Sequence, residues 1–397
     1  MEEMVAGGQR TADEQRAERL PKAFYVFYYG AAACLIPFLS LYYDQIGLSG
    51  DQIGLLAGIP SVLVLVGGAL WGSIADATGR HRLALILAIM GSIVCTQVLS
   101  GIESFLFLVP VVLVLGFFMS PIVPLVDHGV LELLGERRER YGKVRRWGAV
   151  GWGLVGPLIG WIVEHFGIVW SFRGYAVLMF LCLLVVRRLP VQTAAVAGPL
   201  GGGLKRLLAD RRWRLFLFLA FLAGMSSGFA FHYLFLYMDS LGATRSTMGW
   251  TLSVATASEL VAFSFADRWL RRWGARPLLI VGLLASVLRL FAYSIATQPW
   301  QVLVVQLLHG PSFAVMWMAG VSWANRIAPA GMGATAQGLF GGINFGLGGM
   351  AAALVGGALL ERVGATAMYS WATLGMLVGV ALYFLAERLF GDENDSA

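Results

Sequence analysis

The fold is indicated by a polar loop that reads GSIADATGRHR at residues 72–82 and interrupts a long apolar region. A related loop, which reads ADRWLRRWGAR at residues 266–276, occupies the corresponding place in the second half of the chain. Each loop carries an aspartate, a glycine and several arginines, and each follows the second apolar run of its half. Recurrence at corresponding positions predicts a parallel internal repeat of two helix bundles.

The composition is that of a protein embedded in lipid. The 397 residues are 58% hydrophobic and only 13% charged, and the mean hydropathy is +0.73. Soluble domains carry about 25% charged residues. This difference excludes an ordinary cytosolic enzyme and disfavours a nucleic-acid binder, despite the net charge of +6. A helical crossing of the bilayer needs about 20 apolar residues, so roughly twelve crossings with short loops fit the length.

Twelve apolar runs can be recognised, and helices are expected because backbone groups in lipid must be satisfied within their own segment. The first six runs lie at roughly 22–43, 52–74, 83–100, 104–127, 147–165 and 168–187. The second six lie at roughly 214–238, 249–270, 277–296, 300–324, 333–359 and 366–388. We predict an all-α membrane protein with twelve transmembrane helices.

Positive charges predict the orientation, because Lys and Arg accumulate on the cytoplasmic side of a membrane. With the N-terminus inside, all but four of the 29 Lys and Arg residues are cytoplasmic; the four are Arg173, Arg245, Arg289 and Arg362. Both termini are therefore expected in the cytoplasm, in the cytoplasmic membrane of a prokaryote. The predicted domains are a disordered tail at 1–19, a six-helix bundle at 20–188, a cytoplasmic linker at 189–213, a second bundle at 214–389 and a tail at 390–397.

The first loop resembles the Gly-x-x-x-Asp-x-x-Gly-Arg-x-Arg signature of the major facilitator superfamily. That resemblance implies two pseudo-symmetric six-helix bundles and a latch on the cytoplasmic face that controls the change between open states. A carboxylate at a helix end can pair with guanidinium groups and helix termini. In a simpler interpretation the loop arginines serve only as topology anchors. The candidate latch residues are Gly72, Asp76, Gly79, Arg80, Arg82 and Asp267.

A narrower resemblance concerns the fourth and fifth helices. Asp127, the stretch YGKVR at 141–145 and the stretch GAVGW at 148–152 are similar to lactose-permease-type proton symporters, and SPIVPLVD at 120–127 is closer to the phenylpropionate-permease branch. By this resemblance Asp127 and Arg145 line the substrate cavity, although a static ion pair between the two helices is the alternative. Trp152 lies two helical turns after Arg145 on nearly the same face, where an indole can stack on a sugar ring or an aromatic substrate.

Three ionisable residues in the second half match the same pattern. Glu259 lies mid-helix, and Arg289 and His309 come from the next two helices as its expected partners. A charged side chain at the bilayer centre costs roughly 3 kcal/mol, so it usually faces a partner or a wet cavity. We therefore expect substrate contacts from Asp127, Arg145, Trp152, Glu259 and His309. Proton coupling is assigned to Glu259, Arg289, His309 and Asp127.

The sequence departs from lactose permease at positions that bear on the proton route. A lysine and a carboxylate expected around His309 are Gln306 and Ser312 here, so lactose itself is doubtful as a substrate. The stretch Gly156-Pro157 partly resembles the motif of drug–proton antiporters, which keeps export of amphipathic compounds open as the alternative. A membrane-embedded enzyme built on Glu259, His309 and Ser312 lacks a nucleophile elbow or a metal-ligand cluster.

The leading hypothesis is a non-enzymatic secondary transporter that imports a small organic solute, a sugar or an aromatic carboxylate, together with protons. No metal or cofactor is expected, since Cys34, Cys95 and Cys182 all lie in apolar runs without ligand spacing. The expected partners are the solute, protons and the lipid bilayer, with no nucleic acid, and the protein is expected to act as a monomer.

Overall fold

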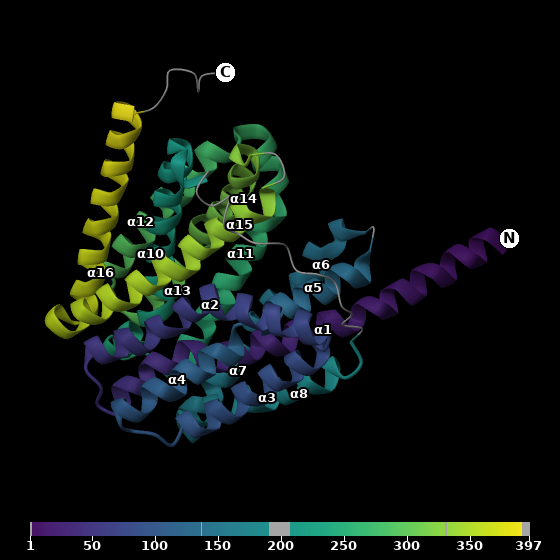
Figure 1. Ribbon diagram of the computed structural model, residues 1–397. Helices are drawn as coiled ribbons and strands as arrows, with labels where there is room; N and C mark the ends of the chain where they lie inside the picture. The colour runs from purple at the N-terminus through teal and green to yellow at the C-terminus, as the bar shows by residue number, and fades with distance from the viewer. Residues whose placement is uncertain (1, 136, 190–206, 330–331, 391–397) are drawn as a thin grey trace.

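The computed structural model describes residues 2–135, 137–189, 207–329 and 332–390, and these residues form helices and connecting turns without strands. The predicted all-α membrane fold is confirmed. Two bundles of helices make up the molecule (Figure 1).

The first bundle is built from the elements before the linker. These are α1 (Glu2–Gln45), α2 (Gly50–Thr78), α3 (His81–Leu99), α4 (Phe105–Met119), α5 (Ile122–Leu134), η1 (Arg138–Arg140), α6 (Tyr141–Arg145), α7 (Trp147–Phe166) and α8 (Val169–Val186). Helices α4 and α5 follow one another as a single span, as do α6 and α7. The break at Ser120 precedes Pro121, whose ring removes a backbone donor.

The second bundle contains two spans with interrupted helical geometry. Its elements are α10 (Arg211–Ser240), α11 (Arg245–Trp273), α12 (Ala275–Ile295), α13 (Pro299–Val305), η2 (Gln306–Leu308), η3 (Gly310–Val315), α14 (Met316–Ile327), α15 (Gly333–Gly341), η4 (Gly342–Gly348) and α16 (Gly349–Phe390). Both η3 and η4 are π-helical. Such segments occur frequently at functional sites.

The helices of the described residues are compatible with the predicted number of crossings. Among the described residues, nine helical segments are long and apolar enough to cross a membrane. One of them, Thr335–Leu389, has 55 residues and reverses at Gly364, whose φ of 78° and ψ of 171° lie outside helical geometry. Helices α2 and α11, of 29 residues each, are also long enough to span. The structure is thus consistent with twelve crossings.

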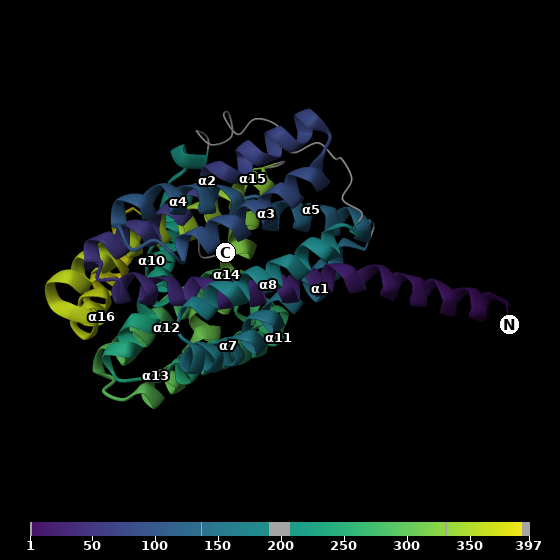
Figure 2. The ribbon, with the colours of Figure 1, turned by 90° about the horizontal axis from the view of Figure 1, so that it is seen from below.

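The bundles meet at one end and spread apart at the other. Figure 1 shows them joining where α16 turns and diverging towards the chain termini. We call the joined end, with the α1–α2, α7–α8 and α10–α11 loops, the Gly50 end, and the other end the Gly79 end. Helix α7 packs along α11, and α2 packs along α16 (Figure 2). These helix pairs form the boundary between the bundles.

The predicted tails and linker differ from the structure or lie outside it. The segment expected as a disordered tail, 1–19, is helical from Glu2 and continues into α1, projecting away from the bundle in Figure 1. Ala, Glu, Gln and Arg are frequent in this segment, and they are strong helix formers. Residues 190–206 of the predicted linker and 391–397 of the predicted C-terminal tail lie outside the described residues.

Candidate functional site

Asp127 and Arg145 form an ion pair between neighbouring helices of the first bundle. Asp127 lies on α5 and Arg145 ends α6, and 3.5 Å separates Asp127 Oδ1 from Arg145 Nε. Two tyrosines of α1 hold the pair, since Tyr25 donates its hydroxyl to Asp127 Oδ1 at 2.6 Å and Arg145 donates to the Tyr29 hydroxyl. The side chains of Asp127 and Arg145 remain 25% and 30% exposed. Both groups are therefore accessible to a solute.

We did not expect either tyrosine at the site. Residues four apart share one face of a helix, so Tyr25 and Tyr29 point in a common direction from α1. The Arg145 Cζ lies 5.1 Å from the Tyr25 ring centre and 4.5 Å from the Tyr29 ring centre. Two tyrosines four residues apart within an otherwise apolar span were the feature of the sequence that could have indicated their role at the site.

Glu259 and His309 form the corresponding pair in the second bundle. Glu259 lies on α11, and its Oε2 is 3.6 Å from His309 Nε2 at the junction of η2 and η3. The His309 ring stacks on Phe313, with ring centres 5.1 Å apart. The side chains of Glu259 and His309 remain 20% and 22% exposed. The expected pairing of Glu259 with His309 is thus present.

The irregular backbone beside His309 is held by α11. Ser258 donates its hydroxyl to the Leu307 carbonyl at 2.5 Å and accepts from the Gly310 amide at 3.0 Å. These bonds satisfy backbone groups where the helix changes from η2 to η3. The position of His309 relative to Glu259 is consequently fixed by the residue that precedes Glu259.

Arg289 does not lie where we expected it. The structure shows no ion pair between Arg289 and Glu259 in the described residues. Instead, the 6% exposed Arg289 donates from Nη2 to Gln306 Oε1 at 2.8 Å and from Nε to the Tyr293 hydroxyl at 2.9 Å. Arg289 thus belongs to a buried polar network with Gln306, one of the positions at which the sequence departs from lactose permease.

Trp152 lies at the boundary between the bundles. Its ring is stacked parallel to Phe231 of α10, with ring centres 6.3 Å apart and an interplanar angle of 14°. The next residue, Gly153, accepts a 2.5 Å hydrogen bond from Ser253 of α11. Trp152 and Gly153 of the first bundle thus contact both α10 and α11 of the second.

The candidate latch residues gather at the Gly79 end. Gly79 has a φ of 63°, which accommodates the sharp turn between α2 and α3. Arg82 donates to the Leu189 carbonyl at 2.6 Å, within the first bundle, whereas Arg80 and Asp267 are exposed. Gly72 and Asp76 lie in the last part of α2, and the side chain of Asp76 lies outside the described part of the structure. No latch between the bundles is assigned from these residues.

The remaining candidates have structural partners. Ser312 donates to the backbone carbonyl of His309 at 3.3 Å. Gly156 of the partial antiporter motif packs against Gly249 and Leu252 of α11. Within the described ranges, no group of three or more His, Cys, Asp or Glu side chains is arranged to hold a metal ion.

Comparison with known proteins gives consistent similarities. A family model described as the MFS_1 like family matches residues 20–371. The chain is 30% identical to a maltose permease of Geobacillus stearothermophilus, over 94% of this chain and 95% of that protein. It is 27% identical to a "Probable 3-phenylpropionic acid transporter" of Escherichia coli strain K12, over 75% and 80% of the two chains. A crystal structure of the nucleoside transporter NupG superimposes with a TM-score of 0.79 at 18% identity, over 95% of this chain and 100% of that one.

Proposed function

The chain belongs to the MFS_1 like family of major facilitator superfamily transporters, and from this membership we propose that it is a proton-coupled symporter for a sugar or glycoside. Transport of a small molecule across a membrane follows from the family. The sugar, the proton and the direction of transport are the proposed part. The observation that carries the proposal is the partly exposed Asp127–Arg145 pair held by Tyr25 and Tyr29.

A neutral polyol suits this pair better than a carboxylate does. Asp127 accepts hydrogen bonds and Arg145 donates them, so neighbouring hydroxyls of a sugar can contact both groups at once. A carboxylate substrate would compete with Asp127 for the guanidinium. Its negative charge would also lie close to the negative charge of Asp127 and repel it. Trp152 adds an aromatic face two helical turns from Arg145. Similarity to a maltose permease supports the same choice.

Proton coupling is proposed for Glu259 and His309. The two side chains lie within 3.6 Å of one another and stay partly exposed, so a proton can reach them and change the charge of the pair. A ligand shifts a conformational equilibrium only through different affinities for the two states. A proton bound at Glu259 is proposed to favour the state in which the sugar binds. Asp127 is the second carboxyl group proposed to bind the coupled proton. Arg289 is proposed to act on the Glu259–His309 pair only through its charge, without direct contact.

From the distribution of positive charges we propose that the Gly79 end faces the cytoplasm and that both termini lie on the cytoplasmic side of the cell membrane. Helices of the two bundles contact each other at the Gly50 end and spread apart at the Gly79 end (Figure 1), and we propose that this arrangement represents the inward-open state. We propose that the transporter works as a monomer, since each chain contains both the Asp127–Arg145 pair and the Glu259–His309 pair.

The test is uptake by purified protein in proteoliposomes with an imposed proton gradient. Labelled maltose, a methyl glycoside, phenylpropionate and a cationic dye serve as solutes. The proposal expects a sugar to accumulate inside the vesicles while the gradient is present, and a protonophore to abolish the accumulation. Accumulation of phenylpropionate alone would favour the aromatic carboxylate. Movement of the dye against the proton gradient would favour the drug–proton antiporter.

A further inference from the structure

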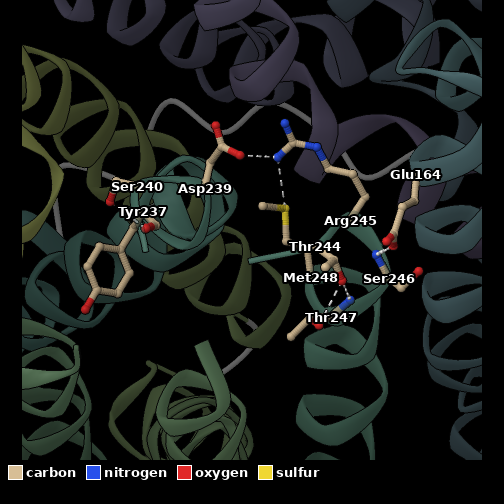
Figure 3. A network of polar contacts seen from close by, with 9 residues as sticks. All are labelled: Glu164, Tyr237, Asp239, Ser240, Thr244, Arg245, Ser246, Thr247 and Met248. Atoms are coloured by element: carbon tan, nitrogen blue, oxygen red, sulfur yellow. Dashed lines mark hydrogen bonds and ion pairs between the residues drawn. The ribbon is translucent and has the colours of Figure 1, made fainter. Parts of the chain in front are cut away.

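At the Gly50 end, each bundle places a carboxylate on the first turn of a helix in the other bundle. Glu361 of α16 accepts a hydrogen bond from the Gly50 amide of α2, with 2.5 Å between nitrogen and Oε2. Glu164 of α7 accepts one from the Ser246 amide of α11, at 2.9 Å (Figure 3). In one contact the second bundle supplies the carboxylate and the first bundle supplies the amide, and in the other contact these roles are reversed.

The helices that supply the two carboxylates repeat the same short pattern. One reads Gly160-x-x-x-Glu164-x-x-Gly167, and the other reads Gly357-x-x-x-Glu361-x-x-Gly364. Gly167 and Gly364 have φ angles of 93° and 78°, and each ends its helical stretch. Because spacing, glutamate and terminating glycine all recur, the two capping carboxylates are equivalent positions of the internal repeat.

The receiving helices also begin alike. Ser49 precedes α2 and accepts from the Gln52 amide at 3.3 Å, and Thr244 precedes α11 and accepts from the Thr247 amide at 3.2 Å. The first amides of a helix have no partner within the helix. The local hydroxyl thus satisfies one of these amides, and the carboxylate from the other bundle satisfies another.

Glycines bring the backbones close enough for these contacts. A Cβ added to Gly160 would lie 3.2 Å from the Gly249 Cα. A Cβ added to Gly54 would lie 3.0 Å from the Gly357 Cα. Larger side chains would separate the helices and withdraw both carboxylates from the amides that they accept from. At each of the two contacts, α7 with α11 and α2 with α16, the helices therefore cross at glycines, and a capping glutamate lies one helical turn further on.

We infer that Glu164 and Glu361 are a symmetric pair of latches that hold the Gly50 end closed. This inference rests on the alternating-access part of the proposed function, in which that end must open. Opening separates α7 from α11 and α2 from α16, which takes each carboxylate away from a helix N-terminus. A carboxylate is stabilised there by the aligned peptide dipoles and by a charge-assisted hydrogen bond. Both contacts are lost on opening, so the pair favours the inward-open state.

Solvent exposure limits how much each glutamate can stabilise the closed Gly50 end. Both glutamates are exposed, and a cleft of about 390 Å³ beside Glu164 admits water between the bundles. Screening reduces such interactions at the surface. Neutralising one glutamate is therefore expected to lower the ratio of molecules closed at the Gly50 end to molecules open at that end. The expected change is about two- to fivefold, the range for an exposed charge at a helix end. The two sites are separate, so the double variant should show roughly the product of the single effects.

The test is the distance between the bundles at the Gly50 end, measured by double electron–electron resonance in lipid nanodiscs without substrate. Cys34, Cys95 and Cys182 are replaced by alanine, and nitroxide labels are attached at Ser104→Cys and Thr366→Cys, which lie on different bundles and are exposed. Glu164→Gln and Glu361→Gln keep the side-chain volume and remove the charge. Each single variant is expected to increase the population at longer distance, and the double variant is expected to increase it further.

Glu103→Gln is the matched control, because Glu103 is an exposed carboxylate in the α3–α4 loop at the same end of the molecule. It should leave the distance distribution unchanged. The inference is overturned if the glutamine variants match the parent, or if Glu103→Gln lengthens the distance equally. If the double variant does not fold, the single variants decide. Since no substrate is used, failure of sugar uptake and failure of the latch are separate results.

Discussion

The hydroxyl of Tyr29 accepts a hydrogen bond from the guanidinium of Arg145, whose Cζ lies 4.5 Å from the centre of the Tyr29 ring. Helix α1 thereby fixes the direction of a cation that α6 supplies. Tyr29 thus belongs to the proposed sugar site, although it lies on a different helix from both members of the ionic pair.

Tyr29→Phe keeps the ring and removes the acceptor from Arg145. The charged guanidinium then loses its hydrogen bond to the neutral Tyr29 hydroxyl, and we expect sugar affinity to fall about tenfold, which corresponds to roughly 1.4 kcal/mol. Equilibrium binding of labelled maltose to the purified protein measures the change. Tyr28→Phe is the control, because it keeps the ring that packs on Phe24 and against the edge of Tyr29 and leaves the Arg145–Tyr29 hydrogen bond in place, so affinity should stay near that of the parent.

Arg145→Lys tests whether the Asp127–Arg145 pair binds substrate. An ammonium group cannot reproduce the planar fork of a guanidinium, so affinity should drop at least about tenfold while the protein still folds. The neighbouring exposed Arg146→Lys should bind normally. If the Arg145 variant bound sugar as tightly as the parent, the Asp127–Arg145 pair would connect α5 to α6 and would not bind the substrate.

Glu259→Gln separates proton coupling from transport. The amide retains a hydrogen-bonding group near His309 but cannot bind and release a proton in the working range. We expect proton-driven accumulation of sugar to be lost and exchange of labelled for unlabelled sugar to continue. Both quantities are measured in proteoliposomes. Accumulation equal to that of the parent would remove Glu259 from the coupling role.

Gln306→Leu tests the buried network of Arg289. The variant removes the acceptor of a charge-assisted bond in the interior, which costs about 1–3 kcal/mol when the donor stays buried. We expect the Tm in detergent to fall by several degrees. Gln337→Leu, at an exposed position that donates to Asn325, should change the Tm far less. An unchanged Tm for Gln306→Leu would mean that Arg289 finds another partner.

The helix framework was predictable because its signals are local. Apolar runs of sufficient length and polar loops at fixed places predict spans whatever their neighbours are. The loops at 72–82 and 266–276 revealed the repeat in this way. Helices α5 and α6 follow one another closely along the chain, so the pairing of Asp127 with Arg145 was also within reach of sequence reasoning.

Contacts between distant spans were predicted less well. Glu259 was expected to contact both Arg289 and His309, and the structure pairs it with His309. Arg289 turns instead to Gln306 and Tyr293. Which partner a buried side chain meets depends on the rotation of each helix about its axis, and apolar periodicity determines that rotation poorly when most faces are apolar.

The sequence by itself determined that this chain crosses the membrane many times, in two related halves, with a small set of charges inside the spans. These properties depend on the free energy of moving each segment into lipid, which is additive along the chain. Only the tertiary structure decided that Tyr25 and Tyr29 hold the ionic pair and that Glu164 and Glu361 cap helices of the opposite bundle. Those contacts depend on how closely helices cross, and the crossing is set by packing at glycines far apart in the sequence.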